Sequence, residues 1–311
     1  MKRRPTLPLG VDVGAERTRI ALAELDESGH PSLVAVAARP TGSDAAQAIA
    51  EARAELGTRE RRCVLALGAP DALLRRAAFP AMPRTERARA ARFEAARFAP
   101  YAPNETALRV LPAGDGRYIL GIARRRALDE RVAAAKRAGL HAVAVDDAAF
   151  ALSRAFEYAD AVIDVGAAAT RLVVAGAPVP AVETFEIGGA TLTAAVAASL
   201  GVGEAAAERR KRSVGLAGAG EHARDALVDA IASALIDHRA RARTELRAIA
   251  LAGNGARLSG FAEALERAVA IPVRLGALGA GVSHTLPADV VRAASPDWGL
   301  AYGLALWETA G

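Results

Sequence analysis

Two kinds of hydrophobic pattern alternate along the chain. Short runs rich in Val, Ile, Leu and Ala predict buried strands, as in residues 9–13 and 61–68. Stretches with apolar residues three and four positions apart predict helices that cover a sheet. Further strands are predicted over 31–40, 73–80, 141–146, 246–253 and 271–276, with a hairpin over 106–125. Helices are predicted over 44–57, 85–101, 126–140, 147–159, from 191 onwards, and over 204–213, 221–246, 259–269 and 297–308. This alternation predicts an α/β fold.

Several helix ends carry residues that are typical of caps. Gly57 and Gly139 follow predicted helices, where a left-handed glycine commonly ends the helical turn. Thr85 and Thr191 precede apolar periodic stretches, and we expect them to be N-caps.

The clearest pattern is a repeat. Residues 11–24 read VDVGAERTRIALAE, and residues 163–176 read IDVGAAATRLVVAG. Each is an apolar strand that ends in an aspartate, turns at a glycine and resumes as a second strand. One such segment is equally consistent with an ordinary hairpin in which Asp favours the turn. Two in the same register predict two related halves, each of which begins with this hairpin.

The two hairpins carry residues suited to phosphate. Gly14 and Gly166 would let backbone N–H groups approach phosphate oxygens without a Cβ in the way. Asp12 and Asp164 would hold Mg²⁺ through water, because this ion keeps most of its hydration shell.

Other residues extend the candidate site. Thr170 is expected to donate its hydroxyl to a phosphate, and Arg19 to reach the same anion from the second strand. The loop Gly253–Asn254–Gly255 follows a predicted strand and would lie flat against a base or ribose. Glu208 and Lys211 are three residues apart on one helix face, where they would contact ribose and base. A solvated ion pair is the alternative for these two.

Composition and charge exclude some classes of function. Hydrophobic residues make up 52% of the 311 residues, and the formal net charge is +5. Nearly all basic residues are arginines interspersed with acids, so we interpret the charge as compositional bias, not as a nucleic-acid or membrane surface. Cys63 is expected in the core, and the histidines lack metal-ligand spacing. The uncharged run 187–203 is interpreted as a buried helix, and the N-terminus lacks a signal-peptide pattern, so we expect a cytoplasmic protein.

The order of these motifs resembles that of the actin, Hsp70 and sugar-kinase superfamily. Within it, four segments resemble the PilM family of type IV pilus assembly proteins: residues 79–101, 133–156, 186–211 and 297–306. The first of them is specific to this branch, because it begins an inserted subdomain. The chain stops after residue 311 without the amphipathic helix that usually ends the related protein FtsA, which also favours PilM.

The resemblance implies a duplicated, actin-like (ribonuclease-H-like) α/β fold with an inserted small α+β subdomain, called 1C in FtsA and PilM. The implied limits are 1–77 with 147–159 for subdomain 1A, 78–146 for subdomain 1C, and 160–311 for the second domain. Within the second domain, subdomain 2B would lie around 201–248.

The resemblance also implies a site for ATP and Mg²⁺. Its residues would be Asp12, Gly14, Ala15, Arg19, Asp164, Gly166, Thr170, Glu208, Lys211, Gly253, Asn254 and Gly255, with Asp12 and Asp164 holding the metal through water. Ala15, Arg19 and Asn254 depart from the superfamily pattern, and the sequence identifies no catalytic residue that orients an attacking water. We therefore expect at most a slow ATPase.

The implied function is that of a cytoplasmic adaptor in pilus assembly. It would bind the N-terminal tail of a PilN-like inner-membrane protein, and through it be recruited to the inner membrane and to the assembly platform and motor. Phe93 and Phe98 are candidates for the tail-binding groove, and packing in the subdomain core is their alternative. Self-association is left open, and neither nucleic-acid binding nor direct membrane insertion is expected. The alternative function is a sugar- or acetate-type kinase of the same superfamily.

Overall fold

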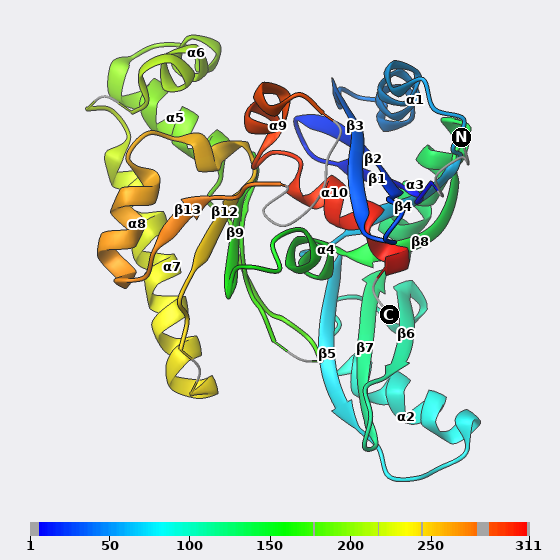
Figure 1. Ribbon diagram of the computed structural model, residues 1–311. Coiled ribbons are helices and arrows are strands. Elements are labelled where there is room, and N and C mark those ends of the chain that lie inside the picture. Colours follow the sequence, from blue (N-terminus) through cyan, green and yellow to red (C-terminus); the bar gives the residue numbers. More distant parts are fainter. Residues whose placement is uncertain (1–5, 177, 217, 244, 279–285, 310–311) are drawn as a thin grey trace.

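The structure, a computed structural model, describes residues 6–176, 178–216, 218–243, 245–278 and 286–309. Two five-stranded sheets lie on either side of a central helix, and a smaller third sheet extends from the first (Figure 1). The first sheet has the order β3-β2-β1-β4-β8. Its strands are β1 (Leu9–Val13), β2 (Arg17–Leu25), β3 (Pro31–Pro40), β4 (Arg62–Leu67) and β8 (His141–Asp147).

The second sheet repeats the plan of the first. Its order is β11-β10-β9-β12-β13, so each sheet has an antiparallel three-stranded meander followed by two parallel strands. The strands are β9 (Ala161–Val165), β10 (Thr170–Val174), β11 (Ala181–Phe185), β12 (Ile249–Ala252) and β13 (Val273–Leu275). The duplicated α/β fold that the repeat predicts is therefore confirmed.

The inserted subdomain is smaller than the sequence suggests. Its sheet has the order β5-β7-β6, with β5 (Ala72–Ala78), β6 (Thr106–Pro112) and β7 (Arg117–Arg124), and α2 (Arg84–Ala96) packs against it. A short 3₁₀ helix, η1 (Pro103–Glu105), precedes β6. The expected limits of 78–146 are wrong at both ends, because β5 already pairs with β7 and because β8 pairs with β4 of the first sheet. A strand pattern does not say which sheet the strand joins.

Helices cover the faces of both large sheets. On the first sheet, α1 (Ala45–Leu56) and α3 (Arg125–Arg137) pack around the buried Ile49 and Ala135. On the second, α7 (Glu221–Ala242) and α8 (Phe261–Val269) supply Leu227, Ile231 and Leu265 to the core. The remaining helices of this half are α5 (Gly189–Leu200), α6 (Glu204–Val214) and α9 (Ala288–Ala294).

Two short helices join the halves. Helix α4 (Ala148–Ala155) lies between the two large sheets, and α10 (Gly299–Ala305) packs against both α4 and β1 (Figure 1). The expected second domain of 160–311 is therefore wrong at its C-terminal end, since α10 belongs to the core of the first sheet. Ala301 and Tyr302 are buried there together with Phe156.

Some element ends differ from the prediction. Thr85 lies inside α2, whose N-cap is Pro83, and Thr191 lies inside α5, where its hydroxyl accepts from the backbone N–H of Gly188. Among the described residues, no single helix is long and apolar enough to cross a membrane. Helices α5 and α6 reach that length and composition only as a pair, bent by 104°.

Candidate functional site

The two repeated hairpins close in the same way. The backbone N–H of Gly14 donates to the carbonyl of Arg17 at 3.1 Å, and that of Gly166 donates to the carbonyl of Ala169 at 3.0 Å. A Cβ added at either glycine would lie 2.9 Å from that carbonyl oxygen, which is too close. The turn itself therefore requires glycine, so these two glycines are not independent support for a phosphate site.

Each hairpin places an arginine directly opposite its aspartate. Asp12 pairs with Arg19 across β1 and β2, and Asp164 pairs with Arg171 across β9 and β10. Arg19 Nη1 lies 3.9 Å from Asp12 Oδ2, whereas Arg171 Nη1 donates to Asp164 Oδ2 at 3.0 Å. Both carboxylates are largely buried, so each guanidinium offsets the cost of keeping its partner ionised.

The charges of the two hairpins act on one another across the space between the halves. Burial raises the pKa of Asp12; the charge of Asp164 raises it further, while Arg19 and Arg171 oppose the shift. The two aspartates and their two arginines therefore form one electrostatic cluster.

Arg171 also connects the cluster to the start of α4. Asp147 ends β8 and caps α4 by accepting from the N–H of Ala149. Burial raises the pKa of Asp147 to about 6, although the bond from Ala149 and the charge of Arg171 both lower it. The Nε of Arg171 is buried without a hydrogen-bond partner among the described residues. An added Cβ at Gly68, just after β4, would lie 3.6 Å from this Nε.

Sequence reasoning missed two members of this cluster. Arg171 occupies the position in the second repeat that Arg19 occupies in the first, so the alignment of the repeats already contained the signal. Asp147 lies at the end of a strand, where a capping aspartate is ordinary, and only the packing of α4 against β10 brings it near the charge of Arg171.

Thr170 has a different role from the expected one. Its side chain is fully buried, and its hydroxyl donates to the carbonyl of Ile187 at 2.7 Å, so the expectation that it donates to a phosphate is wrong. Thr18 is its counterpart in the first hairpin and bonds to Thr41 at 3.1 Å. In both halves this threonine ties the hairpin to the chain that leaves the third strand of the meander.

The Gly-Asn-Gly loop lies against the second aspartate. Gly253 has a φ of 76°, and an added Cβ would lie 2.7 Å from Asp164 Oδ1. At Gly255 an added Cβ would lie 2.4 Å from a methyl group of Val165. The loop continues into a short 3₁₀ helix, η2 (Asn254–Arg257), before α8 begins. Glycine is therefore needed here so that the loop can pack directly on the end of β9.

Glu208 and Lys211 form an ion pair of 2.7 Å on α6. Lys211 also donates to the carbonyl of Gly189 and to the hydroxyl of Thr193, both at 2.7 Å. Burial alone would raise the pKa of Glu208, but hydrogen bonds from Lys211, Thr193 and Arg212 hold it at about 2. The network ties α6 to the first turn of α5. That turn touches the second hairpin, because the N–H of Gly189 donates to the carbonyl of Gly166.

The cluster offers donors that fit the phosphates of a nucleotide. The backbone N–H groups of Ala15, Glu16, Ala167 and Ala168 point from the two hairpin loops and donate to no backbone group in the described part of the chain. The two arginines add positive charge, and the unpartnered Nε of Arg171 is a further donor. Within the described residues, no group of three or more His, Cys, Asp or Glu side chains is placed to hold a metal ion.

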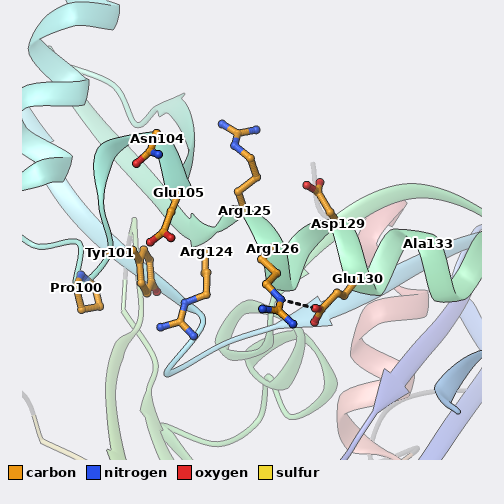
Figure 2. A pocket seen from close by; sticks show the side chains of 10 residues that line it. All are labelled: Pro100, Tyr101, Asn104, Glu105, Arg124, Arg125, Arg126, Asp129, Glu130 and Ala133. Carbon is orange, nitrogen blue, oxygen red and sulfur yellow. Dashed lines mark hydrogen bonds and ion pairs between the residues drawn. The ribbon is translucent and has the colours of Figure 1, made fainter. Parts of the chain in front are cut away.

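A separate groove lies where the inserted subdomain meets the first sheet. It encloses about 750 Å³ and is lined by residues of 100–105 on one wall and of 124–133 on the other (Figure 2). Tyr101 forms its base, with its hydroxyl bonded to the carbonyl of Pro70 and with Arg124 5.0 Å above its ring. The sequence did not indicate these residues as a binding surface.

The two phenylalanines proposed for partner binding lie outside this groove. Phe93 is 76% exposed on α2, so the alternative that it packs in the subdomain core is wrong. Phe98 is 40% exposed and lies beneath the guanidinium groups of Arg75 and Arg97, 5.3 and 5.7 Å from its ring centre.

Comparison with known proteins identifies the family. The sequence model of the type IV pilus assembly protein PilM matches residues 41–309. The chain belongs to the PilM family. Among solved structures, one described as the PilM–PilN type IV pilus biogenesis complex is 28% identical, with a TM-score of 0.81 and coverage of 96% of this chain and 97% of that one. No curated protein matches the chain.

More distant structures share only the fold. The ethanolamine utilization protein EutJ of Carboxydothermus hydrogenoformans is 17% identical, with a TM-score of 0.60 over 98% of this chain and 90% of that one. Component A of the (R)-2-hydroxyglutaryl-CoA dehydratase of Acidaminococcus fermentans is 13% identical, with a TM-score of 0.50 over 97% of each chain. The actin-like fold that the motif order implies is thereby confirmed.

Proposed function

We propose that this PilM-family protein is a nucleotide-dependent adaptor of type IV pilus assembly that binds the N-terminal cytoplasmic tail of a PilN-like inner-membrane protein. The observation that carries the proposal is the similarity over nearly the whole chain to the PilM of a PilM–PilN complex. This similarity includes the inserted subdomain and favours an adaptor over a small-molecule kinase.

The groove at the base of the inserted subdomain is the proposed seat of the tail. Glu105 and Asp129 come from opposite walls, are exposed, and make no ion pair among the described residues (Figure 2). Glu130, by contrast, is paired with Arg126 at 2.7 Å. Cytoplasmic segments next to membrane spans are rich in Lys and Arg, so a tail of this kind would carry positive charge that the two free carboxylates complement. Pro100 on one wall and Ala133 on the other would contact its hydrophobic side chains.

The cluster between the halves is the proposed site for ATP with Mg²⁺. Asp12 and Asp164 would hold the ion through water, the hairpin N–H groups would bind phosphate oxygens, and Gly253–Gly255 would lie along the adenosine. The ion would supply charge neutralisation for the phosphates. Since each carboxylate also faces an arginine, binding would require the guanidinium groups to turn from the carboxylates toward the phosphates.

Titration of a fluorescent tail peptide into the full-length protein tests the adaptor role. The peptide should come from the PilN-like protein of the same pilus system. Replacing Glu105 by Gln together with Asp129 by Asn should weaken binding about three- to tenfold, because exposed charge pairs contribute modestly. The matched control is Glu86→Gln with Asp115→Asn, which removes the same charge from exposed positions of the subdomain outside the groove.

The same titration in apo, ADP and Mg-ATP states tests the dependence on nucleotide. Different affinities would support a switch. Identical affinities with retained nucleotide binding would leave a static adaptor, and no binding in any state would contradict the adaptor role.

A further inference from the structure

The positive charge of the chain is concentrated on the inserted subdomain. Residues 72–124 contain ten arginines and four acidic residues, whereas the other residues contain 30 basic and 31 acidic residues. A bias toward arginine across the whole protein would enrich both regions, but outside the subdomain every base is matched by an acid. The net positive charge of the chain is therefore located in this subdomain.

The uncompensated charge faces outward from α2, which lies at the far end of the subdomain from the central helix (Figure 1). Arg84, Arg89 and Arg92 are exposed and form no ion pair with any described residue. The inner face of α2 is apolar, with Ala91 and Ala95 fully buried against the sheet. The helix is thus anchored by one face. Arg89 and Arg92 lie away from that face, whereas Arg84 begins the helix seven residues before Ala91 and is exposed at its end.

An aromatic side chain stands among these arginines. Phe93 is 76% exposed, four residues after Arg89 and next to Arg92, so it shares their helix face. Glu86 is exposed on the same face, seven residues before Phe93, and Glu94 is partly buried and paired with Arg97 at 3.0 Å. We define the arginine face of α2 as Arg89, Arg92 and Phe93, together with Arg84 exposed at the start of the helix.

We propose that the arginine face of α2 binds the surface of an anionic lipid bilayer. Arginines near such a surface are attracted to acidic headgroups, and a single aromatic ring inserts at the level of the headgroups. A helix with one exposed aromatic ring suits a flat, deformable surface, whereas the groove of Figure 2 suits a peptide. Only residues 97–99 separate α2 from the first groove residue. Contact of α2 with lipid would therefore keep the groove close to the membrane surface, where the tail of a membrane protein emerges.

Co-sedimentation of the full-length protein with vesicles tests this proposal without partner or nucleotide. We expect binding to vesicles of phosphatidylcholine with phosphatidylglycerol, little binding to phosphatidylcholine alone, and weakening as ionic strength rises. Arg84→Gln, Arg89→Gln and Arg92→Gln together should lower the partition coefficient about a hundredfold, since each arginine contributes a several-fold factor. The matched control is Arg239→Gln, Arg241→Gln and Arg267→Gln, which removes equal charge from exposed positions on α7 and α8.

A second measurement locates the contact. Phe93→Trp should show blue-shifted emission with anionic vesicles and quenching by brominated lipid, whereas Ile236→Trp, at an exposed position on α7, should show neither. Equal losses in the two triple variants, no quenching at position 93, or binding to duplex DNA but not to anionic vesicles would each overturn the proposal. Because the groove variants Glu105→Gln and Asp129→Asn should bind vesicles normally, failure here is distinguishable from failure of tail binding.

Discussion

Substitution of Gly303 by alanine tests the joint between the two halves. An added Cβ at this position would lie 1.8 Å from the carbonyl oxygen of Ala151 on α4. On the opposite side of α10, a Cβ at Gly10 of β1 would lie 1.8 Å from the carbonyl oxygen of Ala301. Helix α10 is therefore held between β1 and α4 by contacts between backbones, with no space for a methyl group on either side.

The expected loss of stability follows from this geometry. Inserting a methylene into a packed core costs about 1–3 kcal/mol when side chains can adjust. Here the obstructing atoms belong to the backbone of a buried helix, so α10 and α4 must separate by more than 1 Å. We therefore expect a loss near the upper end, about 3 kcal/mol, which corresponds to a fall in Tm of roughly 5 °C for a protein of this size.

Thermal unfolding followed by circular dichroism measures this effect, with Gly203→Ala as the control. Gly203 precedes α6, has a φ of −69°, and an added Cβ would meet nothing within 4 Å. The Gly303→Ala variant should also bind Mg-ATP more weakly, because α4 begins next to Asp147 and β1 carries Asp12. A Tm for Gly303→Ala within 1–2 °C of the control would refute the close approach of α10 to α4.

Three further predictions concern the cluster between the halves. Asp164→Ala should weaken Mg-ATP binding in calorimetry more than Glu208→Ala, and the reverse order would show that the site is assigned wrongly. Thr170→Val should cost about 1–3 kcal/mol of stability, measured as a fall in Tm, because the carbonyl of Ile187 loses its donor. Loss of a phosphate ligand would weaken nucleotide binding, whereas this variant should keep a nucleotide affinity within about twofold of the native value in calorimetry. The pKa of the Asp147 carboxyl is near its ordinary value of 3.8 in the unfolded chain, but burial raises this pKa to about 6 in the folded protein, so native stability should fall as pH rises through this interval. The drop is at most about 3 kcal/mol, and Asp147→Asn should abolish it in urea unfolding at pH 4 and pH 6.5.

Local patterns in the sequence predict most elements of this fold. The hairpin repeat is visible because its strands, turn glycine and facing aspartate are all set by neighbours in sequence. Gly57 ends α1 with a φ of 62°, and Gly139 follows α3 with a φ of 74°, as expected of left-handed glycines. Assignment of elements to domains was less successful, because β5 and α10 have ordinary patterns and only tertiary contacts decide what they pack on.

The candidate site shows the same limit. The aspartates are predictable because each stands before a turn that recurs in the same register. The role of Thr170 could not be predicted, because its partner, Ile187, lies beyond a third strand that the sequence pattern does not indicate. Gly68 and Arg171 line the same pocket although they belong to different halves, so no local pattern reveals that they are neighbours.

The internal symmetry suggests how the two proposed sites communicate. In the second half, the chain leaves β12 through the loop Gly253–Gly255, which packs on Asp164. In the first half, the equivalent exit from β4 leads through Gly68 into the inserted subdomain. The subdomain thus occupies the place that the loop Gly253–Gly255 occupies in the other half, and its entry point at Gly68 lies near Arg171, the partner of Asp164. If the proposed sites are correct, a movement of Arg171 on nucleotide binding would act at the base of the inserted subdomain, without a long chain of intermediates.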